Sequence, residues 1–239
     1  MSNSRRTAAD ARSAFQSCRS PDPKDRVQFY DSWAETYEKD HGLASYRAPH
    51  LAVEFLSKNF CGSPEEALVL DVACGSGWVA KLMFELGFRN FVGVDGSKGM
   101  LEQAVKSSLY QDLRLALLGS QQLPAQTGTF DVVIIVGALR PGFVPVSIVR
   151  ELCQAAKPGG YVCMTRVDPK SESGDRYKAS MELELHLMED EGLWTHVATE
   201  DMHHYMVDVY NNHNKEEQNE QYLNGTMYLY RKKEYRRYF

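Results

Sequence analysis

The sequence lacks both an excess of positive charge and any long apolar run. Its 239 residues include 27 Lys and Arg against 32 Asp and Glu, which gives a net charge of −5. Without a broad basic surface, nucleic acid is not expected as a partner. No apolar run approaches the roughly 20 residues that span a bilayer, and residues 1–20 lack the apolar centre of a secretory signal. We therefore expect a cytoplasmic protein that does not enter a membrane.

Cysteine is also scarce. The sequence has five cysteines, an odd number, with no C-x-x-C pair. This pattern predicts neither a disulfide framework nor a metal site. The cysteines are Cys18, Cys61, Cys74, Cys153 and Cys163. Cys74 lies in the glycine-rich turn and Cys163 in an apolar strand, so small buried thiols are expected there.

The most informative segment that is present covers residues 68–95, "LVLDVACGSGWVAKLMFELGFRNFVGVD". An apolar strand, a glycine-rich turn, an amphipathic helix and a second apolar strand ending in an acid follow one another. This order builds a βαβ unit that binds a nucleotide-like ligand at the carboxyl edge of its sheet. Gly75 and Gly77 allow the turn to bring backbone N–H groups against that ligand. A chain of this length can bury the core of one α/β domain.

Two classes of ligand fit this segment. Gly75, Gly77 and Ala80 match the G-x-G-x-x-G/A spacing of nicotinamide dinucleotide binders. Asp71 argues against a dinucleotide, because an acid at the end of the first strand would repel a pyrophosphate. It suits a cationic ligand such as S-adenosylmethionine. Asp95 ends the second strand, where it is placed to accept both ribose hydroxyls.

Four segments resemble the main motifs of class I S-adenosylmethionine-dependent methyltransferases in order and spacing. They are "VLDVACGSG", "FVGVDGSKGMLEQA", "LPAQTGTFDVVIIVGAL" and "KPGGYVCMT". More narrowly, "FYDSWAETYEKD" with "YRAP" resembles the methyltransferase-like protein family linked to the Williams-Beuren syndrome chromosome region. The resemblance covers residues 29–166. It implies a seven-stranded, mostly parallel, doubly wound Rossmann-like α/β sheet with an antiparallel edge hairpin and N-terminal lid helices.

The same resemblance implies in-line transfer of a methyl group from S-adenosylmethionine, leaving S-adenosylhomocysteine. In the wider superfamily an acid after the third strand often contacts adenine, and Gly119 stands there in this sequence, so Ser120 and Gln121 become the candidates. Val136 and Gly137, at the end of the fourth strand, are expected to border the methionine moiety. The other cofactor-binding residues predicted from the motifs are Asp71, Ala73, Cys74, Gly75, Gly77, Asp95, Gly96, Ser97 and Met100.

Three residues before the first motif have two interpretations each. Tyr37 and Tyr46 either close over the sulfonium with their aromatic faces or belong to the core. Arg47 either pairs with the methionine carboxylate or is a solvated surface residue. Arg140, just after the fourth strand, either holds an anionic substrate or is exposed.

No catalytic residue is assigned, because positioning alone can contribute roughly 7–11 kcal/mol to a displacement of this kind. The histidines that are credible proton acceptors are His41, His50, His203 and His204.

The remaining pattern predicts a mobile segment 1–20 with a short helix at 8–15, lid helices within 21–62 and a core of 63–239. Asp22 and Pro23 start a helix whose apolar face runs through Tyr37, and a second helix starts near Pro49. Both are expected across the ligand edge, and 211–221 is expected to be a mobile loop. The predicted later strands are 113–118, 130–136, 161–166, 203–210 and 222–231, and the predicted later helices are 97–106, 145–156 and 175–191.

Three functions stay open. The favoured one is a methyltransferase acting on a small molecule, or less readily on protein. The second is a non-catalytic S-adenosylmethionine-binding protein that works through protein contacts. The third is an NAD-dependent oxidoreductase, which needs a proton donor; the sequence's Tyr-x-x-x-Lys, Tyr228 with Lys232, falls on a predicted strand that holds the two apart. Oligomeric state is not predicted.

Overall fold

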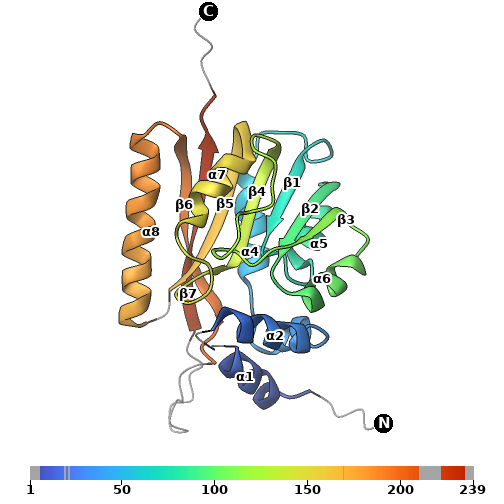
Figure 1. The fold of residues 1–239 in the computed structure, drawn as a ribbon. Helices are drawn as coiled ribbons and strands as arrows, with labels where there is room; N and C mark the ends of the chain where they lie inside the picture. Colours follow the sequence, from blue (N-terminus) through green and yellow to red (C-terminus); the bar gives the residue numbers. More distant parts are fainter. Residues whose placement is uncertain (1–5, 19, 21, 169, 210–221, 235–239) are drawn as a thin grey trace, which may run out of the picture.

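A computed structural model describes residues 6–18, 20, 22–168, 170–209 and 222–234. Within them the strands form one seven-stranded sheet in the order β3-β2-β1-β4-β5-β7-β6 (Figure 1). This confirms the predicted α/β fold class. The strands are β1 (Leu68–Val72), β2 (Asn90–Asp95), β3 (Tyr110–Leu115), β4 (Phe130–Leu139), β5 (Ala156–Asp168), β6 (Trp194–Val207) and β7 (Tyr222–Lys232).

Strands β1 to β5 run parallel, and β7 runs in the opposite direction between β5 and β6. β1 pairs with both β2 and β4. β7 lies between β5 and β6 and is antiparallel to both. The predicted antiparallel edge pair is therefore present, and the parallel strand ends meet at one edge of the sheet.

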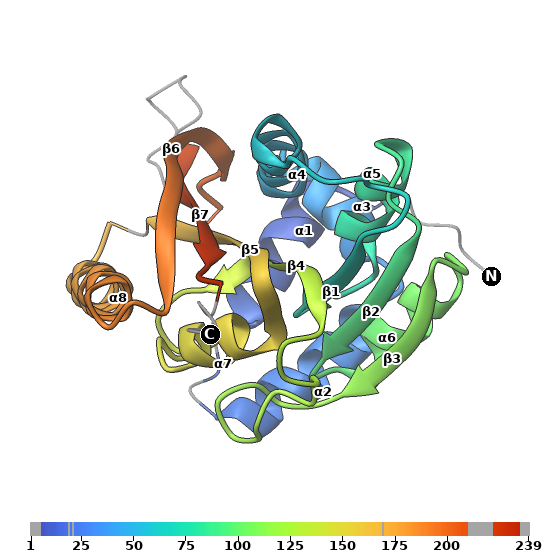
Figure 2. The ribbon, with the colours of Figure 1, turned by 90° about the horizontal axis from the view of Figure 1, so that it is seen from above.

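Helices cover both faces of the sheet (Figure 2). α4 and α5 pack on one face and α7 and α8 on the other, and α6 contacts β2 and β3. Strand side chains alternate between the faces, so Val69 of β1 joins one core cluster while Leu70 and Val72 join the other. The helices are α1 (Ala8–Ser17), α2 (Pro23–Trp33), α3 (Tyr37–Leu43), α4 (Ala48–Asn59), α5 (Trp78–Glu85), α6 (Lys98–Val105), α7 (Ile148–Ala155) and α8 (Glu172–Asp190).

Two strands differ from their predicted positions. β3 is placed at 110–115 and not at 113–118, because Tyr110 pairs with Phe91 of β2 and starts the strand there. β6 begins at Trp194, well before the predicted start at 203. It is an edge strand whose first half is largely exposed, so it carries no apolar alternation that would mark it.

The N-terminal region differs more. Residues 8–17 form α1, capped by Thr7, with Ala11, Ala14 and Phe15 buried, which agrees with the short helix predicted at 8–15. The helix predicted through Tyr37 is two helices, because α2 ends at Trp33 and α3 begins at Tyr37. α4 packs on the sheet face and is not a lid.

No helix in the described ranges has the length and apolarity to cross a bilayer. The predicted loop at 211–221 and the end of the chain after Glu234 lie outside the described residues.

Candidate functional site

A pocket opens where β1, β2 and β4 end, and α2 covers it. Its lining comes from six regions of the sequence: α2, the start of α3, the glycine-rich turn, the β2–α6 junction, the segment after β3, and the end of β4 with the loop that follows it. The lining residues are Pro23, Arg26, Val27, Tyr30, Tyr37, Ala73, Gly75, Asp95, Gly96, Ser97, Met100, Leu117, Leu118, Val136, Gly137, Ala138, Phe143 and Val144.

Nine of the residues predicted to bind the cofactor lie in this pocket. They are Tyr37, Ala73, Gly75, Asp95, Gly96, Ser97, Met100, Val136 and Gly137. The others do not line it: Asp71, Cys74, Gly77, Gly119, Ser120, Gln121, Tyr46 and Arg47.

The glycine-rich turn adopts left-handed backbone at three positions, with φ of +54° at Ala73, +55° at Gly75 and +87° at Gly77. A Cβ at Gly75 would meet nothing within 4 Å, so Gly75 is needed for its conformation. A Cβ at Gly77 would lie 3.1 Å from the Tyr110 ring. Gly77 therefore lets α5 start close to the sheet and has a packing role.

Asp95 holds this turn from the neighbouring strand. Its carboxylate accepts the Gly75 N–H at 2.8 Å through Oδ2 and the Ser97 N–H at 2.8 Å through Oδ1. Burial raises the pKa of Asp95, and the backbone hydrogen bonds from Ser97 and Gly75 oppose that rise. A carboxylate offers about four acceptor sites, so Asp95 can accept further hydrogen bonds from a ligand in the pocket that it lines.

Asp71 does not face the pocket as the sequence argument expected. Its side chain is buried and accepts a hydrogen bond of 2.7 Å from the Tyr110 hydroxyl. Burial raises the pKa of Asp71 to about 7, against the lowering effect of the Tyr110 hydrogen bond. The expected pair of carboxylates at the pocket is therefore reduced to Asp95. Nothing in the sequence pointed to Tyr110, because the contact joins residues 39 positions apart.

Helix α2 is attached to the start of α6 by one side chain. Asp31 Oδ1 accepts hydrogen bonds from Ser97 Oγ at 2.6 Å and from the Gly99 N–H at 2.9 Å. Ser97 also caps α6 by accepting the Met100 N–H, as the sequence predicted. The covering helix is thus bonded to the residue next to Asp95.

At the β4 side, aromatic residues from α3, the α3–α4 turn and β6 surround Gly137. The Tyr46 and Tyr205 hydroxyls lie 3.5 Å apart, and both side chains are buried. A Cβ on Gly137 would lie 2.3 Å from the Tyr46 hydroxyl oxygen and 3.5 Å from that of Tyr205. The His41 ring is tilted by 38° against the Tyr37 ring, with centroids 3.9 Å apart. We call Tyr37, which lines the pocket, and His41, Tyr46 and Tyr205, which pack behind its lining, the aromatic end of the pocket.

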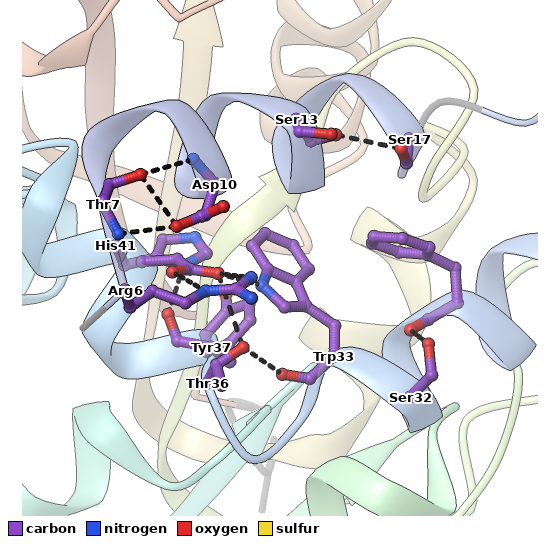
Figure 3. Close-up of polar contacts among 12 residues, drawn as sticks. Arg6, Thr7, Asp10, Ser13, Ser17, Ser32, Trp33, Thr36, Tyr37 and His41 are labelled. Atoms are coloured by element: carbon purple, nitrogen blue, oxygen red, sulfur yellow. Dashed lines mark hydrogen bonds and ion pairs between the residues drawn. The ribbon is translucent and has the colours of Figure 1, made fainter. Parts of the chain in front are cut away.

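Asp40 of α3 is bonded to Trp33 of α2 and to Arg6, which precedes α1. Arg6 and Trp33 lie side by side in Figure 3. The Asp40 carboxylate accepts hydrogen bonds from Arg6 Nε at 2.7 Å and Trp33 Nε1 at 2.7 Å. Burial alone would raise the pKa of Asp40, but these bonds hold it below its usual value. The buried carboxylate is therefore ionised and paired.

Of the candidate proton acceptors, His41 is the one beside the pocket. Its Nδ1 donates to the Tyr37 carbonyl at 2.9 Å, and burial lowers its pKa to about 3. His41 is therefore neutral at physiological pH. His50, His203 and His204 are exposed.

The adenine candidates and Arg47 do not line the pocket, although Gly119 and Ser120 line an adjoining hollow that shares Leu117, Leu118 and Phe143 with it. Gln121 uses its side-chain oxygen to accept the Leu117 N–H at 2.8 Å, and the backbone of Gly119 packs against Pro145. Arg47 is exposed, and its N–H donates to the Tyr205 carbonyl. Pocket residues that the sequence did not single out include Arg26, Leu117 and Phe143. Their positions depend on how α2 and two loops fold over the strand ends, for which the sequence offers no signal. No group of three or more His, Cys, Asp or Glu within the described ranges could hold a metal.

The comparisons with known proteins agree with this geometry. A family model described as "Methyltransferase domain" matches residues 70–164. Methyltransferase-like protein 27 from Homo sapiens is 47% identical over 174 residues, which is 73% of this chain and 70% of that protein. The demethylmenaquinone methyltransferase of Bacillus pumilus is 36% identical over 110 residues, and the match covers 44% of this chain and 47% of that enzyme. The crystal structure of the [4+2]-cyclase SpnF matches with a TM-score of 0.63 at 16% identity, over 90% of this chain and 97% of that one.

The sheet order and the pocket at its carboxyl edge are those of a class I methyltransferase. At the level of sequence, the chain belongs to the family of methyltransferase-like protein 27. The likeness to a cyclase concerns the fold alone, and the reaction has to be argued from the site.

Proposed function

We propose that this protein transfers a methyl group from S-adenosylmethionine to a small-molecule acceptor. The observation that carries the proposal is the position of Asp95, which lines the pocket at the end of β2 while it holds the glycine-rich turn. Membership of a methyltransferase family supports the same reaction.

The pocket residues suit the adenosyl part of this cofactor. Asp95 has acceptor sites for the two ribose hydroxyls. Met100, Leu117 and Leu118 give an apolar lining beside it, which suits the faces of an adenine ring.

The rest of the pocket suits the methionine part. The open space at Gly75 leaves room at the tip of β1, and Gly137 lines the pocket at the tip of β4. Tyr30 and Tyr37 line the same space, and aromatic rings favour a nearby cation by roughly 0.5–2 kcal/mol. When bound, S-adenosylmethionine supplies a methyl group on a cationic sulfur that leaves as a neutral thioether. The protein's part is to orient the acceptor and exclude water.

The cover over the pocket favours a small acceptor. Pro23, Arg26 and Tyr30 of α2 lie over the strand tips, and Asp31 bonds that helix to α6. A folded protein surface would have to displace α2. The similar Bacillus pumilus protein is, by its name, a demethylmenaquinone methyltransferase, which supports a small organic acceptor here.

Calorimetry of the purified chain with S-adenosylmethionine, S-adenosylhomocysteine and NAD tests this proposal. We expect both adenosyl compounds to bind and NAD not to compete. Asp95→Ala should weaken S-adenosylmethionine binding by about 30- to 150-fold, the equivalent of about 2–3 kcal/mol, because charge-assisted hydrogen bonds and the support of Gly75 are lost. Asp190→Ala, an exposed acid at the end of α8, should bind as the unmodified chain does.

Preferential binding of NAD would overturn the proposal in favour of an oxidoreductase. Tight binding of S-adenosylmethionine without transfer to any metabolite or protein extract would favour a non-catalytic binding protein. If Asp95→Ala and the unmodified chain bound S-adenosylmethionine equally well, the cofactor would have to bind outside the pocket that Asp95 lines.

A further inference from the structure

The hollow that adjoins the pocket is a second space at the same edge of the sheet. Its wall comes from the start of α2, the turn after β3, the loop after β4 and the first half of α8. Its volume of about 630 Å³ is that of a ligand-binding pocket. The residues that line both the hollow and the pocket are Pro23, Arg26, Leu117, Leu118, Phe143 and Val144.

The hollow is open on the side where β3 leads to β4. Parallel strands are usually joined by a crossover that contains a helix. In this chain residues 116–129 make the connection with turns and extended backbone and without a helix (Figure 2). No helix of this connection therefore separates the pocket at Leu117 and Leu118 from the hollow beside it.

The turn after β3 offers no carboxylate at this junction. Gly119 stands where an acid was considered, and its φ is +83°. A Cβ at Gly119 would lie 2.5 Å from two atoms of the Pro145 ring, so a side chain there would be strained and would clash. Ser120 is exposed, and the side-chain oxygen of Gln121 accepts the Leu117 N–H. An adenine beside this turn would therefore meet no acid at its amino group.

The wall of the hollow suits an uncharged, apolar group. Two prolines, two valines and a phenylalanine of the loop after β4 line it. The two arginines on the wall already have partners: Arg26 Nη1 donates to the Ser20 carbonyl at 2.7 Å, and Arg176 pairs with Glu172. These contacts give no reason to expect an ion in the hollow, whereas apolar side chains are the usual lining around rings and alkyl groups.

The proposed position of the cofactor fixes which part of it faces the hollow. Asp95 lines the pocket and not the hollow, so the ribose would be held on the pocket side. Leu117 and Leu118 line both spaces, so the base would lie at their junction. The exocyclic amine of adenine is on the ring remote from the bond to the ribose, and it therefore points away from Asp95 toward the hollow.

From this arrangement we infer that the protein also binds adenosyl compounds that carry an additional apolar group on the exocyclic amine of adenine, and that this group lies in the hollow. The inference rests on the proposed binding of S-adenosylmethionine. A substituted amine keeps one N–H, and burial of the added group against the apolar wall is favourable. Enlargement at the ribose is not tolerated in the same way, because its hydroxyls are held at Asp95.

Calorimetry with analogues of S-adenosylhomocysteine tests the inference. One analogue carries a phenethyl group on the exocyclic amine of adenine, and the other carries the same group on a ribose hydroxyl. We expect the amine analogue to bind within about threefold of S-adenosylhomocysteine, because the hollow receives the group. The ribose analogue should bind about 100-fold more weakly, because its group would displace a hydrogen bond to Asp95 and meet the pocket wall.

A pair of variants on α8 shows where the added group lies. Ser180 is exposed and lines the hollow but not the pocket. Ser180→Trp fills the hollow and should weaken binding of the amine analogue by about tenfold or more relative to S-adenosylhomocysteine. Ala179→Trp is the matched control, because Ala179 is the preceding residue of the same helix, is exposed and does not line the hollow. It should leave the ratio of the two affinities unchanged.

Two results would overturn the inference while leaving the proposed cofactor in place. In the first, S-adenosylhomocysteine binds to the unmodified chain and the amine analogue binds about 100-fold more weakly or not at all. In the second, Ser180→Trp and Ala179→Trp have the same effect on the amine analogue, which would place its added group outside the hollow. Failure of S-adenosylhomocysteine itself to bind would instead contradict the proposed function.

Discussion

The two ends of the pocket are built in different ways. At the end formed by β1, β2 and α6, backbone amides hold the functional carboxylate: Asp95 accepts the N–H groups of Gly75 and Ser97. At the aromatic end, side chains are held by other side chains, as in the contacts of Tyr46 with Tyr205 and of Tyr37 with His41.

This difference suits the first end to binding a common cofactor and the aromatic end to recognising a particular acceptor. A site fixed by backbone amides persists when side chains change, which suits a cofactor common to many relatives. A site fixed by side-chain packing changes shape with single substitutions, which suits recognition of one acceptor. The predictions below address the first end, the second end and the link between them.

The largest effect is expected at Asp71, below the glycine-rich turn. Its pKa is raised from 3.8 to about 7, so the folded state disfavours the ionised form. The stability that comes from the protonated form is present below about pH 4 and is lost as pH rises through about 7. The amide of Asp71→Asn does not titrate in this range. The free energy of unfolding of Asp71→Asn minus that of the unmodified chain should therefore rise by up to about 4 kcal/mol between pH 4 and pH 8. Urea unfolding across that range measures the difference.

The control for Asp71 is Asp190→Asn, at an exposed position, whose relative stability should stay nearly constant with pH. A constant difference for Asp71→Asn as well would mean that Asp71 titrates normally in the folded protein. The amide keeps an acceptor for the Tyr110 hydroxyl, so a lost hydrogen bond should not mask the result.

At the aromatic end, Gly137→Ala should lower the free energy of unfolding by about 3 kcal/mol. Gly137 has φ of +79°, where a Cβ costs about 1–2 kcal/mol. The new Cβ would also lie 2.3 Å from the Tyr46 hydroxyl oxygen, an overpacking that costs about 1–3 kcal/mol. Denaturant unfolding provides the measurement.

Two companion variants separate these contributions. Gly128 has φ of +70° with nothing within 4 Å of an added Cβ, so Gly128→Ala should show the backbone cost alone. In a Tyr46→Phe background, Gly137→Ala should lower the free energy of unfolding by about 1 kcal/mol less, because the Tyr46 hydroxyl oxygen that the new Cβ would meet is absent. An equal loss in both backgrounds would mean that the Tyr46 hydroxyl does not lie against Gly137.

The smallest effect is expected at Asp31, which links α2 to α6. Asp31→Ala removes the acceptor of the Ser97 hydroxyl and the Gly99 N–H, and should cost about 1 kcal/mol of stability. Because α2 covers the pocket, stopped-flow measurements should show S-adenosylmethionine leaving about fivefold faster. Glu35→Ala, an exposed acid just after α2, should change neither quantity. Unchanged dissociation in Asp31→Ala would mean that α2 does not limit release.

Sequence reasoning reached the first end of the pocket and much less of the second. The turn at Gly75 and the tip at Asp95 belong to one βαβ unit, so local patterns sufficed to bring them together. Gly137 was placed at the pocket because it follows the fourth predicted strand. Tyr37 was placed there because it lies in the segment that precedes the first motif. Arg47 and Gln121 were also chosen by proximity to motifs, but their side chains lie away from the pocket, because a motif does not specify the direction of neighbouring residues.

The βαβ unit of residues 68–95 and the capped helix after Asp95 were determined by the sequence itself, because apolar periodicity, glycines and capping residues act over short distances. The closing antiparallel pair was implied by the family resemblance. Only the tertiary structure decided that Tyr110 buries Asp71 and that Tyr205 reaches Tyr46, a contact across 159 positions. Such contacts depend on how β7 enters between β5 and β6 and how three N-terminal helices pack, which no local pattern specifies.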